Sequence, residues 1–200
     1  MEKTIFLFRR HKARSPDNFA AHYIGNHAPL GARLTRCLRG YTVNIVDGEG
    51  GPDAITEHWV DRASDLLTPE IAYATTEDFQ AVVADDRSLF DGMAELYVAV
   101  EEIVHGGAPL DVPLAAPTPE TKVVWFFADA DAAPPIPAAA RRVVDNRIGY
   151  RLVFTERGRE KVASEIGLIR MAWGPDLPGS GPDLTKETVV REYRFIAAPG

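Results

Sequence analysis

The hydrophobic pattern of the first half of the chain predicts four strands and a long helix. Short apolar runs rich in β-prone residues predict strands at residues 4–9, 40–46, 54–61 and 95–104. A helix is expected to start at Ser15 and Pro16, because serine is a good N-cap and proline is favoured at the first helical position. Its apolar face comprises Phe19, Tyr23, His27, Leu30 and Leu34. Pro29 is expected to bend or break this helix.

A second helix is expected to follow residues 75–78, whose sequence Thr-Thr-Glu-Asp resembles a capping box. Its buried side is predicted to consist of Phe79, Val82, Val83, Phe90 and Met93. The first half therefore has the order β-α-β-β-α-β. This is the ferredoxin-like arrangement, an antiparallel four-stranded sheet with two helices on one face. The other face needs a cover if it is apolar, and a second sheet can supply one.

The second half repeats this pattern in a reduced form. Strands are predicted at residues 122–128, 149–155, 168–173 and 188–197, with a short helix at residues 138–144. Residues 175–185, where a second helix would lie, are rich in glycine and proline and are predicted to form a loop. The predicted fold class is therefore α+β: a ferredoxin-like half and a degenerate second ferredoxin-like half form an α+β barrel. The barrel can close within one chain or between the two chains of a homodimer.

A proline-rich stretch divides the chain near its middle. It contains Pro109, Pro113, Pro117 and Pro119, and proline disfavours both helices and inner strands. We predict a ferredoxin-like domain at residues 1–105, a linker at residues 106–120 and the degenerate second domain at residues 121–200.

Composition and charge exclude several classes of function. The net charge is −7 and the pI about 5.3, which argues against nucleic-acid binding. The dense basic run at residues 9–14 is interpreted as a solvated strand end or as a rim that attracts anions. Cys37 is the only cysteine, so no intrachain disulfide can form, as in a reducing compartment. No signal-like segment or apolar stretch of membrane-spanning length is visible, and we expect a cytoplasmic protein without membrane contact.

The sequence also lacks the motifs of the common cofactor and metal sites. It contains no phosphate-binding or dinucleotide-binding glycine motif, no nucleophile elbow and no His/Cys spacing typical of zinc. His22 and His27 are five residues apart and cannot chelate one ion from a regular helix. We therefore expect no cofactor and no metal.

Several short segments resemble the EthD family of dimeric α+β barrels over about residues 1–105. The tetrapeptide His-Ala-Pro-Leu stands at residues 27–30, although an isoleucine follows Tyr23 where the family has a tryptophan. Further similarities are Arg-Gly-Tyr-Thr-Val-Asn at residues 39–44, the acidic and tryptophan positions of residues 54–61, and an aspartate at residue 85 or 86 ahead of a phenylalanine. The resemblance implies a barrel with a pocket between sheet and helix. It also implies cofactor-free chemistry on small cyclic or aromatic molecules, as in a methylmuconolactone isomerase and fungal polyketide decarboxylases.

His27 is the main catalytic candidate. It shares a helix face with Phe19 and Tyr23, and an imidazole with a pKa near 6.5 suits proton transfer. A core histidine satisfied by one backbone carbonyl is the alternative. Tyr23 is a candidate substrate-binding residue on the same face.

The strand at residues 54–61 offers two alternatives, because side chains alternate between the faces of a sheet. His58 points opposite to Glu57 and Trp59, so the pocket contains either a second imidazole or a carboxylate and an aromatic wall with His27 as partner. We favour His58 on the outside or at the rim, while both His58 and Glu57 stay catalytic candidates.

Three further residues are candidates for substrate binding. Tyr41 and Asn44 are three positions apart on one strand and must face opposite sides. Trp125 begins the aromatic run of the second half, from which at least one ring is expected to line the cleft.

The sequence thus favours a cofactor-independent lyase or isomerase that acts on a small cyclic or aromatic metabolite by histidine acid/base catalysis. The alternatives are a cofactor-free oxygenase of the same barrel type and a non-catalytic small-molecule-binding protein.

Overall fold

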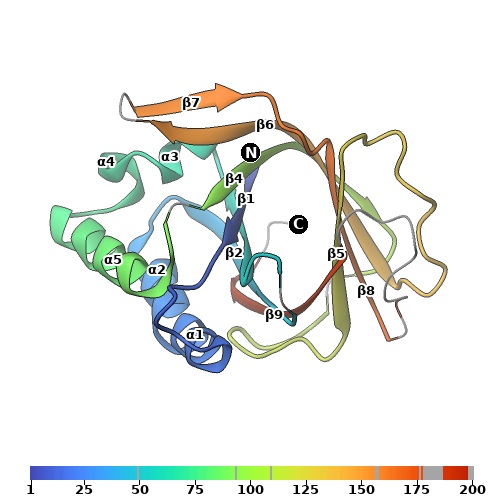
Figure 1. The fold of residues 1–200 in the computed structure, drawn as a ribbon, viewed down its shortest axis with the longest axis horizontal. Helices are drawn as coiled ribbons and strands as arrows, with labels where there is room; N and C mark the ends of the chain where they lie inside the picture. Colours follow the sequence, from blue (N-terminus) through green and yellow to red (C-terminus); the bar gives the residue numbers. More distant parts are fainter. Residues whose placement is uncertain are drawn as a thin grey trace.

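The chain forms a closed antiparallel β-barrel of eight strands, with helices on the outside of its first half (Figure 1). A computed structural model describes residues 1–48, 50–92, 94–108, 110–155, 158–175, 177 and 187–197. The strand order is β4-β1-β3-β2-β9-β5-β8-β6, and β6 pairs with β4 to close the barrel. The ninth strand, β7, pairs with the far end of β6. The prediction of a fold that combines helices with a barrel is confirmed.

The first half contains four strands and all the helices of the described residues. Its strands are β1 (Glu2–Phe8), β2 (Leu38–Val46), β3 (Ala54–Val60) and β4 (Glu95–His105). Its helices are α1 (Pro16–His22), the π-helical turn η1 (Tyr23–His27), α2 (Ala28–Leu34), α3 (Ala63–Leu66), α4 (Pro69–Ala72) and α5 (Thr76–Leu89). The predicted caps are present, because the hydroxyls of Ser15 and Thr75 accept the N–H groups of Asn18 and Asp78.

Pro29 changes the first helix without breaking it. A proline has no N–H to donate to the carbonyl of Gly25, and the preceding turn widens into η1. The N–H of Ala28 donates to the carbonyl of Tyr23, five residues earlier. On α5, Val82 and Phe90 are buried and Phe79 and Val83 half-buried, as predicted, whereas Met93 lies outside the described residues.

The second half contains β5 (Thr121–Phe127), β6 (Arg142–Thr155), β7 (Gly158–Val162), β8 (Leu168–Gly174) and β9 (Glu187–Ile196). Its four predicted strands are confirmed, but the helix predicted at residues 138–144 is wrong. Residues 138–141 form a turn, and β6 begins at Arg142 because the β-branched Val143 and Val144 pair with β8. β7 was not predicted, and most of the expected loop at residues 175–185 lies outside the described residues.

The two halves have the same strand order, β4-β1-β3-β2 in the first and β9-β5-β8-β6 in the second. They meet at two seams, where β2 pairs with β9 and β4 with β6. The barrel therefore closes within one chain. The linker at residues 106–120 lies against β9. There the backbone N–H groups of Ala115 and Thr118 donate to the backbone carbonyls of Arg194 and Glu192.

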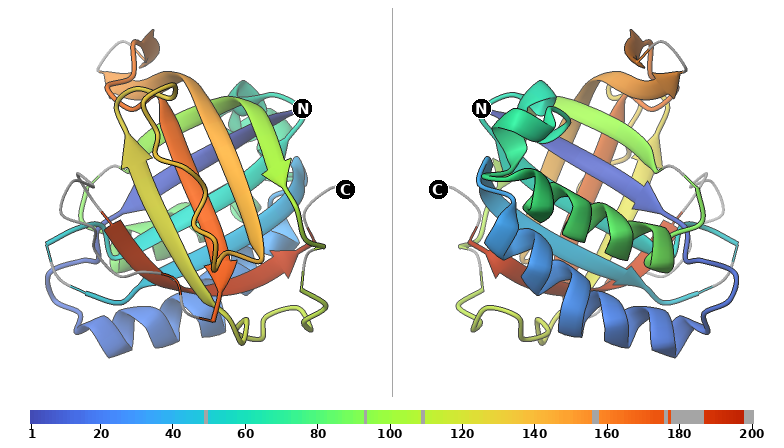
Figure 2. Two further views of the ribbon diagram at one scale, coloured as in Figure 1. Left: turned by 90° about the vertical axis from the view of Figure 1, so that its right-hand side faces the viewer. Right: turned by 90° about the vertical axis from the view of Figure 1, so that its left-hand side faces the viewer.

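The outer faces of the two halves are covered differently. Helices α1, α2 and α5 lie across the outside of the first four strands (Figure 2, right). The extended segment at residues 128–141 crosses the outside of β5, β8 and β6 (Figure 2, left). No helix among the described residues has the length and apolar character needed to cross a membrane.

Candidate functional site

The barrel lumen contains a cavity of about 950 Å³ at one end. It lies where β1 and β6 begin and β3, β4, β8 and β9 end, and the linker borders it through Gly107 and Leu110. The rest of the lumen is filled by an apolar cluster that includes Ile5, Ile55 and Met171. The barrel is thus packed at one end and hollow at the other.

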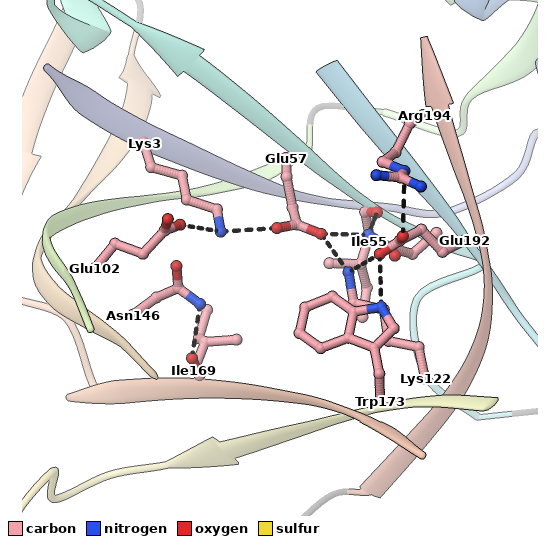
Figure 3. Close-up of polar contacts among 11 residues, drawn as sticks. Lys3, Ile55, Glu57, Glu102, Lys122, Asn146, Ile169, Trp173, Glu192 and Arg194 are labelled. Atoms are coloured by element: carbon pink, nitrogen blue, oxygen red, sulfur yellow. Dashed lines mark hydrogen bonds and ion pairs between the residues drawn. The ribbon is translucent and has the colours of Figure 1, made fainter. Parts of the chain in front are cut away.

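A row of charged side chains, all buried except Glu102, runs along the inner wall of this cavity (Figure 3). Lys3, Glu57, Glu102 and Glu192 line the cavity, and Lys122 lies between Glu57 and Glu192. The Lys3 ammonium lies 2.7 Å from Oε2 of Glu57 and 2.7 Å from Oε2 of Glu102. The Lys122 ammonium donates to Oε1 of Glu57 at 2.6 Å and to Oε2 of Glu192 at 2.8 Å. Glu57 therefore bridges one lysine from each half of the chain.

Two tryptophans complete the row. The Lys3 ammonium lies 4.4 Å from the ring centre of Trp59, and that of Lys122 lies 4.5 Å from the ring centre of Trp173. The indole N–H of Trp173 donates to Glu192 at 3.1 Å. Each lysine is thus held by two carboxylates and an aromatic face, which compensates for the loss of water around a buried ammonium group.

The electrostatic environment keeps these groups charged. Burial by itself would raise the pKa of Glu57, but the positive charges of Lys122 and Lys3 outweigh burial and lower that pKa below its usual range. Burial would likewise lower the pKa of Lys122, but Glu192 and Glu57 outweigh it and raise that pKa. At neutral pH Glu57 is a poor proton acceptor and Lys122 a poor nucleophile, so these residues can bind and orient but not exchange protons readily.

The same contacts occur at equivalent positions in the two halves. Lys3 stands opposite Trp59 in the β1–β3 ladder, and Lys122 stands opposite Trp173 in the β5–β8 ladder. The amide of Asn44 donates to the carbonyl of Ile55 at 2.8 Å, and the amide of Asn146 donates to that of Ile169 at 2.9 Å. Asn44 also donates to Glu57, whose position in the second half is occupied by Met171.

A second group of polar residues, the histidine cluster, lies on the outer face of the first half, under the helices. It comprises His22, Tyr23, His27, Tyr41, Thr56, His58, Asp85 and Asp86. Nδ1 of His27 lies 2.8 Å from Oδ2 of Asp85, whose other oxygen lies 2.8 Å from Nε2 of His22. Nε2 of His27 lies 3.4 Å from Asp86. Asp85 therefore fixes the His27 ring from α5.

His58 is the other imidazole of the cluster. Its ring stacks on Tyr41 with 4.7 Å between ring centres and meets Phe6 edge-on. Its Nδ1 is buried and has no hydrogen-bond partner among the described residues. Burial, reinforced by the charge of His27, lowers the pKa of His58 to about 3, so its ring is neutral at physiological pH. The hydroxyl of Tyr23 shares a 2.7 Å hydrogen bond with Thr56.

The structure places the predicted site residues, apart from Trp125, in two separate groups. His27, His58, Tyr23 and Tyr41 lie in the histidine cluster, whereas Glu57, Asn44 and Trp59 belong to the lumen. The predictions that His58 faces away from Glu57, and Tyr41 away from Asn44, are confirmed. The expectation that His27 and Glu57 share one cleft is wrong, because the helices pack on the outer face of the sheet and only alternate residues of β3 reach the lumen.

The prediction that Trp125 lines the cleft is also wrong. It is buried on the outer face of β5 beside Val123, Val143 and Ala172, away from the lumen. Phe126, the next residue, belongs to the apolar cluster inside the barrel. One aromatic side chain of this run thus faces inward, but it is not the predicted one.

Five residues of the lumen were not predicted from the sequence: Lys3, Lys122, Glu192, Trp173 and Asn146. One signal was available, since a lysine stands at or next to the start of the first predicted strand in each half. A lysine at such a position usually lies at the solvated end of a strand, which is why the signal was overlooked.

Comparisons with known proteins do not assign the chain to a family. No protein-family model matches it, and no curated protein is detectably similar to it in sequence. Among the described residues, no group of three or more His, Cys, Asp or Glu side chains is arranged to hold a metal ion.

Proposed function

We propose that the protein binds a small organic molecule in the barrel lumen. The observation that carries this proposal is the row of buried charges beside an open cavity of about 950 Å³. Eight-stranded barrels have a lumen that is either filled by side chains or large enough for one small ligand. Buried ion pairs contribute less to stability than well-packed apolar residues of similar volume. A row of them at the wall of a cavity is better suited to recognising a ligand than to stabilising the fold.

The walls of the cavity support a ligand with a flat, apolar frame. Trp59 and Trp173 both line it, and aromatic rings provide large contact areas with defined geometry. This agrees with the small cyclic or aromatic molecules that the family resemblance implies.

Two matched variants test the proposal. Val104 is half-exposed and lines the cavity, whereas Val189 is similarly exposed but does not line it. A library of monocyclic aromatic fragments is screened against the protein by ligand-observed NMR. Val104→Trp should abolish the binding of the hits, and Val189→Trp should leave it intact. A library without hits, or hits that bind equally to both variants, would contradict a lumen site.

The second candidate function is a cofactor-independent lyase or isomerase in which His27 transfers protons. The contact between Nδ1 of His27 and Asp85 favours it, because a carboxylate that orients an imidazole is a recurring device of acid/base catalysis. Asp85 also lines a surface groove of about 420 Å³ together with Gly25 and Pro29, which offers a route to the histidine cluster. The neutral His58 would be the partner of His27.

His27→Ala and His27→Gln test this second function against a panel of small cyclic and aromatic metabolites without added cofactor. Catalysis predicts similar melting temperatures and a loss of roughly 10²–10⁴-fold in turnover in both variants. A purely structural His27 predicts the reverse, a loss of about 1–3 kcal/mol in stability with unchanged turnover. Oxygen uptake during turnover would instead favour a cofactor-free oxygenase.

We also propose that both halves derive from a ferredoxin-like unit and that the chain is related to the EthD family. The shared strand order and the equivalent Lys–Trp and Asn–Ile contacts of the two halves support the first idea. The second rests on the short sequence similarities. We further propose a cytoplasmic location, which cell fractionation can test. We also propose a homodimer, which sedimentation can test.

A further inference from the structure

The charged side chains that line the lumen cavity are predominantly acidic. Seven carboxylates line it, against four cationic side chains, and the ammonium of Lys122 adds a fifth positive charge directly behind Glu57 and Glu192. Opposite charges that face one low-dielectric cavity partly cancel, and the remainder sets the sign of the field inside. An anionic ligand would therefore add to an existing excess of negative charge.

The cationic side chains of the lining are already engaged by the protein. Lys3 contacts Glu57, Glu102 and the face of Trp59. Arg141 is paired with Glu120. The remaining two, Arg142 and Arg194, donate to the backbone carbonyls of Gly107 and Leu110 in the linker. Each guanidinium keeps further N–H groups, but an anion that bound them would still face the excess of carboxylates in the lining.

Three acceptor atoms in or beside the lumen have no partner or are only partly used. Asn146 is fully buried, and its Oδ1 has no partner among the described residues. The side chain of Asn146 points from β6 toward Lys3 and Glu102 (Figure 3). Oδ1 of Asn44, also fully buried, is likewise unpartnered. Glu102, whose side chain is partly exposed to the cavity, uses only Oε2 for Lys3. Of these three residues, Glu102 lines the cavity, and a ligand that brings a donor can satisfy its Oε1.

We propose that the lumen ligand is a small organic cation, a protonated amine on an aromatic or apolar frame. The ammonium group lies next to Glu102, and the frame lies against Trp59 and Trp173. This inference rests on the proposed lumen-binding function and specifies the chemical class of its ligand.

Three probes of the same shape test the charge of the ligand: 2-phenylethylamine, 2-phenylethanol and phenylacetate. Their affinities for the full chain are measured by ligand-observed NMR at neutral pH and low salt. The amine should bind about tenfold more tightly than the alcohol, and phenylacetate should bind most weakly. Glu102→Gln should remove most of the preference for the amine while the affinity for the alcohol stays the same. Glu160→Gln, on the exposed face of β7, is the matched control and should change neither affinity.

The outcomes separate this inference from the function on which it rests. If phenylacetate binds more tightly than the amine, and Val104→Trp blocks it, the ligand class is wrong and the lumen site stands. If none of the three probes binds while fragment hits remain sensitive to Val104→Trp, the ligand class is again wrong and the lumen site stands. If no fragment binds, or binding is insensitive to Val104→Trp, both proposals fail. Should Glu102→Gln not fold, the ranking of the three probes on the unaltered protein still decides.

Discussion

The two halves of the barrel share inward-facing lysine, asparagine, isoleucine and tryptophan positions, yet they differ at three consecutive positions of one strand. In the paired registers, Ile55 and Trp59 of β3 correspond to Ile169 and Trp173 of β8. The three residues between them do not match. Thr56 corresponds to Arg170, Glu57 to Met171 and His58 to Ala172.

This difference separates what the barrel needs from what is specific to the first half. The shared residues line or fill the lumen and recur wherever the strand order recurs. Glu57 adds a central carboxylate that contacts a lysine from each half. His58 points to the helix-covered side, whereas Ala172 packs beneath the extended segment at residues 128–141 with Trp125. The unmatched positions are therefore those with a chemical role to explain.

The largest effect is expected from separating the halves. A fragment of residues 1–105 would expose the edges of β2 and β4 and the inward apolar residues, because both seams are lost. We expect it to aggregate or to form an obligate dimer, which size-exclusion chromatography with light scattering would show beside the full chain. A stable monomeric fragment with cooperative unfolding would mean that the first half does not need the second.

The next largest effect is expected from Glu57→Met, which makes β3 resemble β8. It leaves Lys3 and Lys122 with one carboxylate each in a buried site, and breaking a buried ion pair costs about 3–5 kcal/mol. Urea denaturation at pH 7 measures the loss. Adding Lys122→Met should lower the stability further, because it also removes the ammonium partner of the buried Glu192. A double variant as stable as Glu57→Met, or more stable, would argue against this account.

His58→Ala, which imitates Ala172, should alter the response to acid. The folded protein holds the pKa of His58 at about 3, below the usual value of about 6.5 in an unfolded chain. The unfolded state then binds more protons as the pH falls below about 6.5, and stability declines by up to about 1.4 kcal/mol per pH unit. We expect His58→Ala to flatten this decline between pH 6.5 and 5 in chemical denaturation. His11→Ala, outside the cluster, is the control and should retain the full slope.

The smallest expected effect is the difference in stability between variants of the two tryptophans. Trp173→Phe removes an indole N–H that donates to the buried Glu192. Trp59 instead contacts the Lys3 ammonium through the face of its ring, which a phenylalanine can replace. We expect Trp173→Phe to be more destabilising than Trp59→Phe by about 1 kcal/mol, the usual net value of one hydrogen bond. Equal losses in thermal melts at pH 7 would indicate that packing alone decides both positions.

Local pattern was enough to predict much of the fold. Ser15 and Thr75 start their helices as predicted, and the alternation along β3 correctly placed His58 opposite to Glu57 and Trp59. These features depend on residues close together in the sequence, where hydrogen bonding and side-chain spacing act directly. The helix predicted at residues 138–144 failed because pairing with β8 outweighed a weak local signal.

By itself, the sequence determined the order of most elements, the division into two halves with similar strand patterns and the opposite orientation of neighbouring side chains. Only the tertiary structure decided which face of each strand is inside, because that depends on where the helices pack and on closure across the two seams. For the same reason it separated His27 from Glu57 and brought Lys3, Lys122 and Glu192 together from strands more than fifty residues apart. A lysine at the start of an apolar run becomes a buried, charged wall only when distant carboxylates are folded against it.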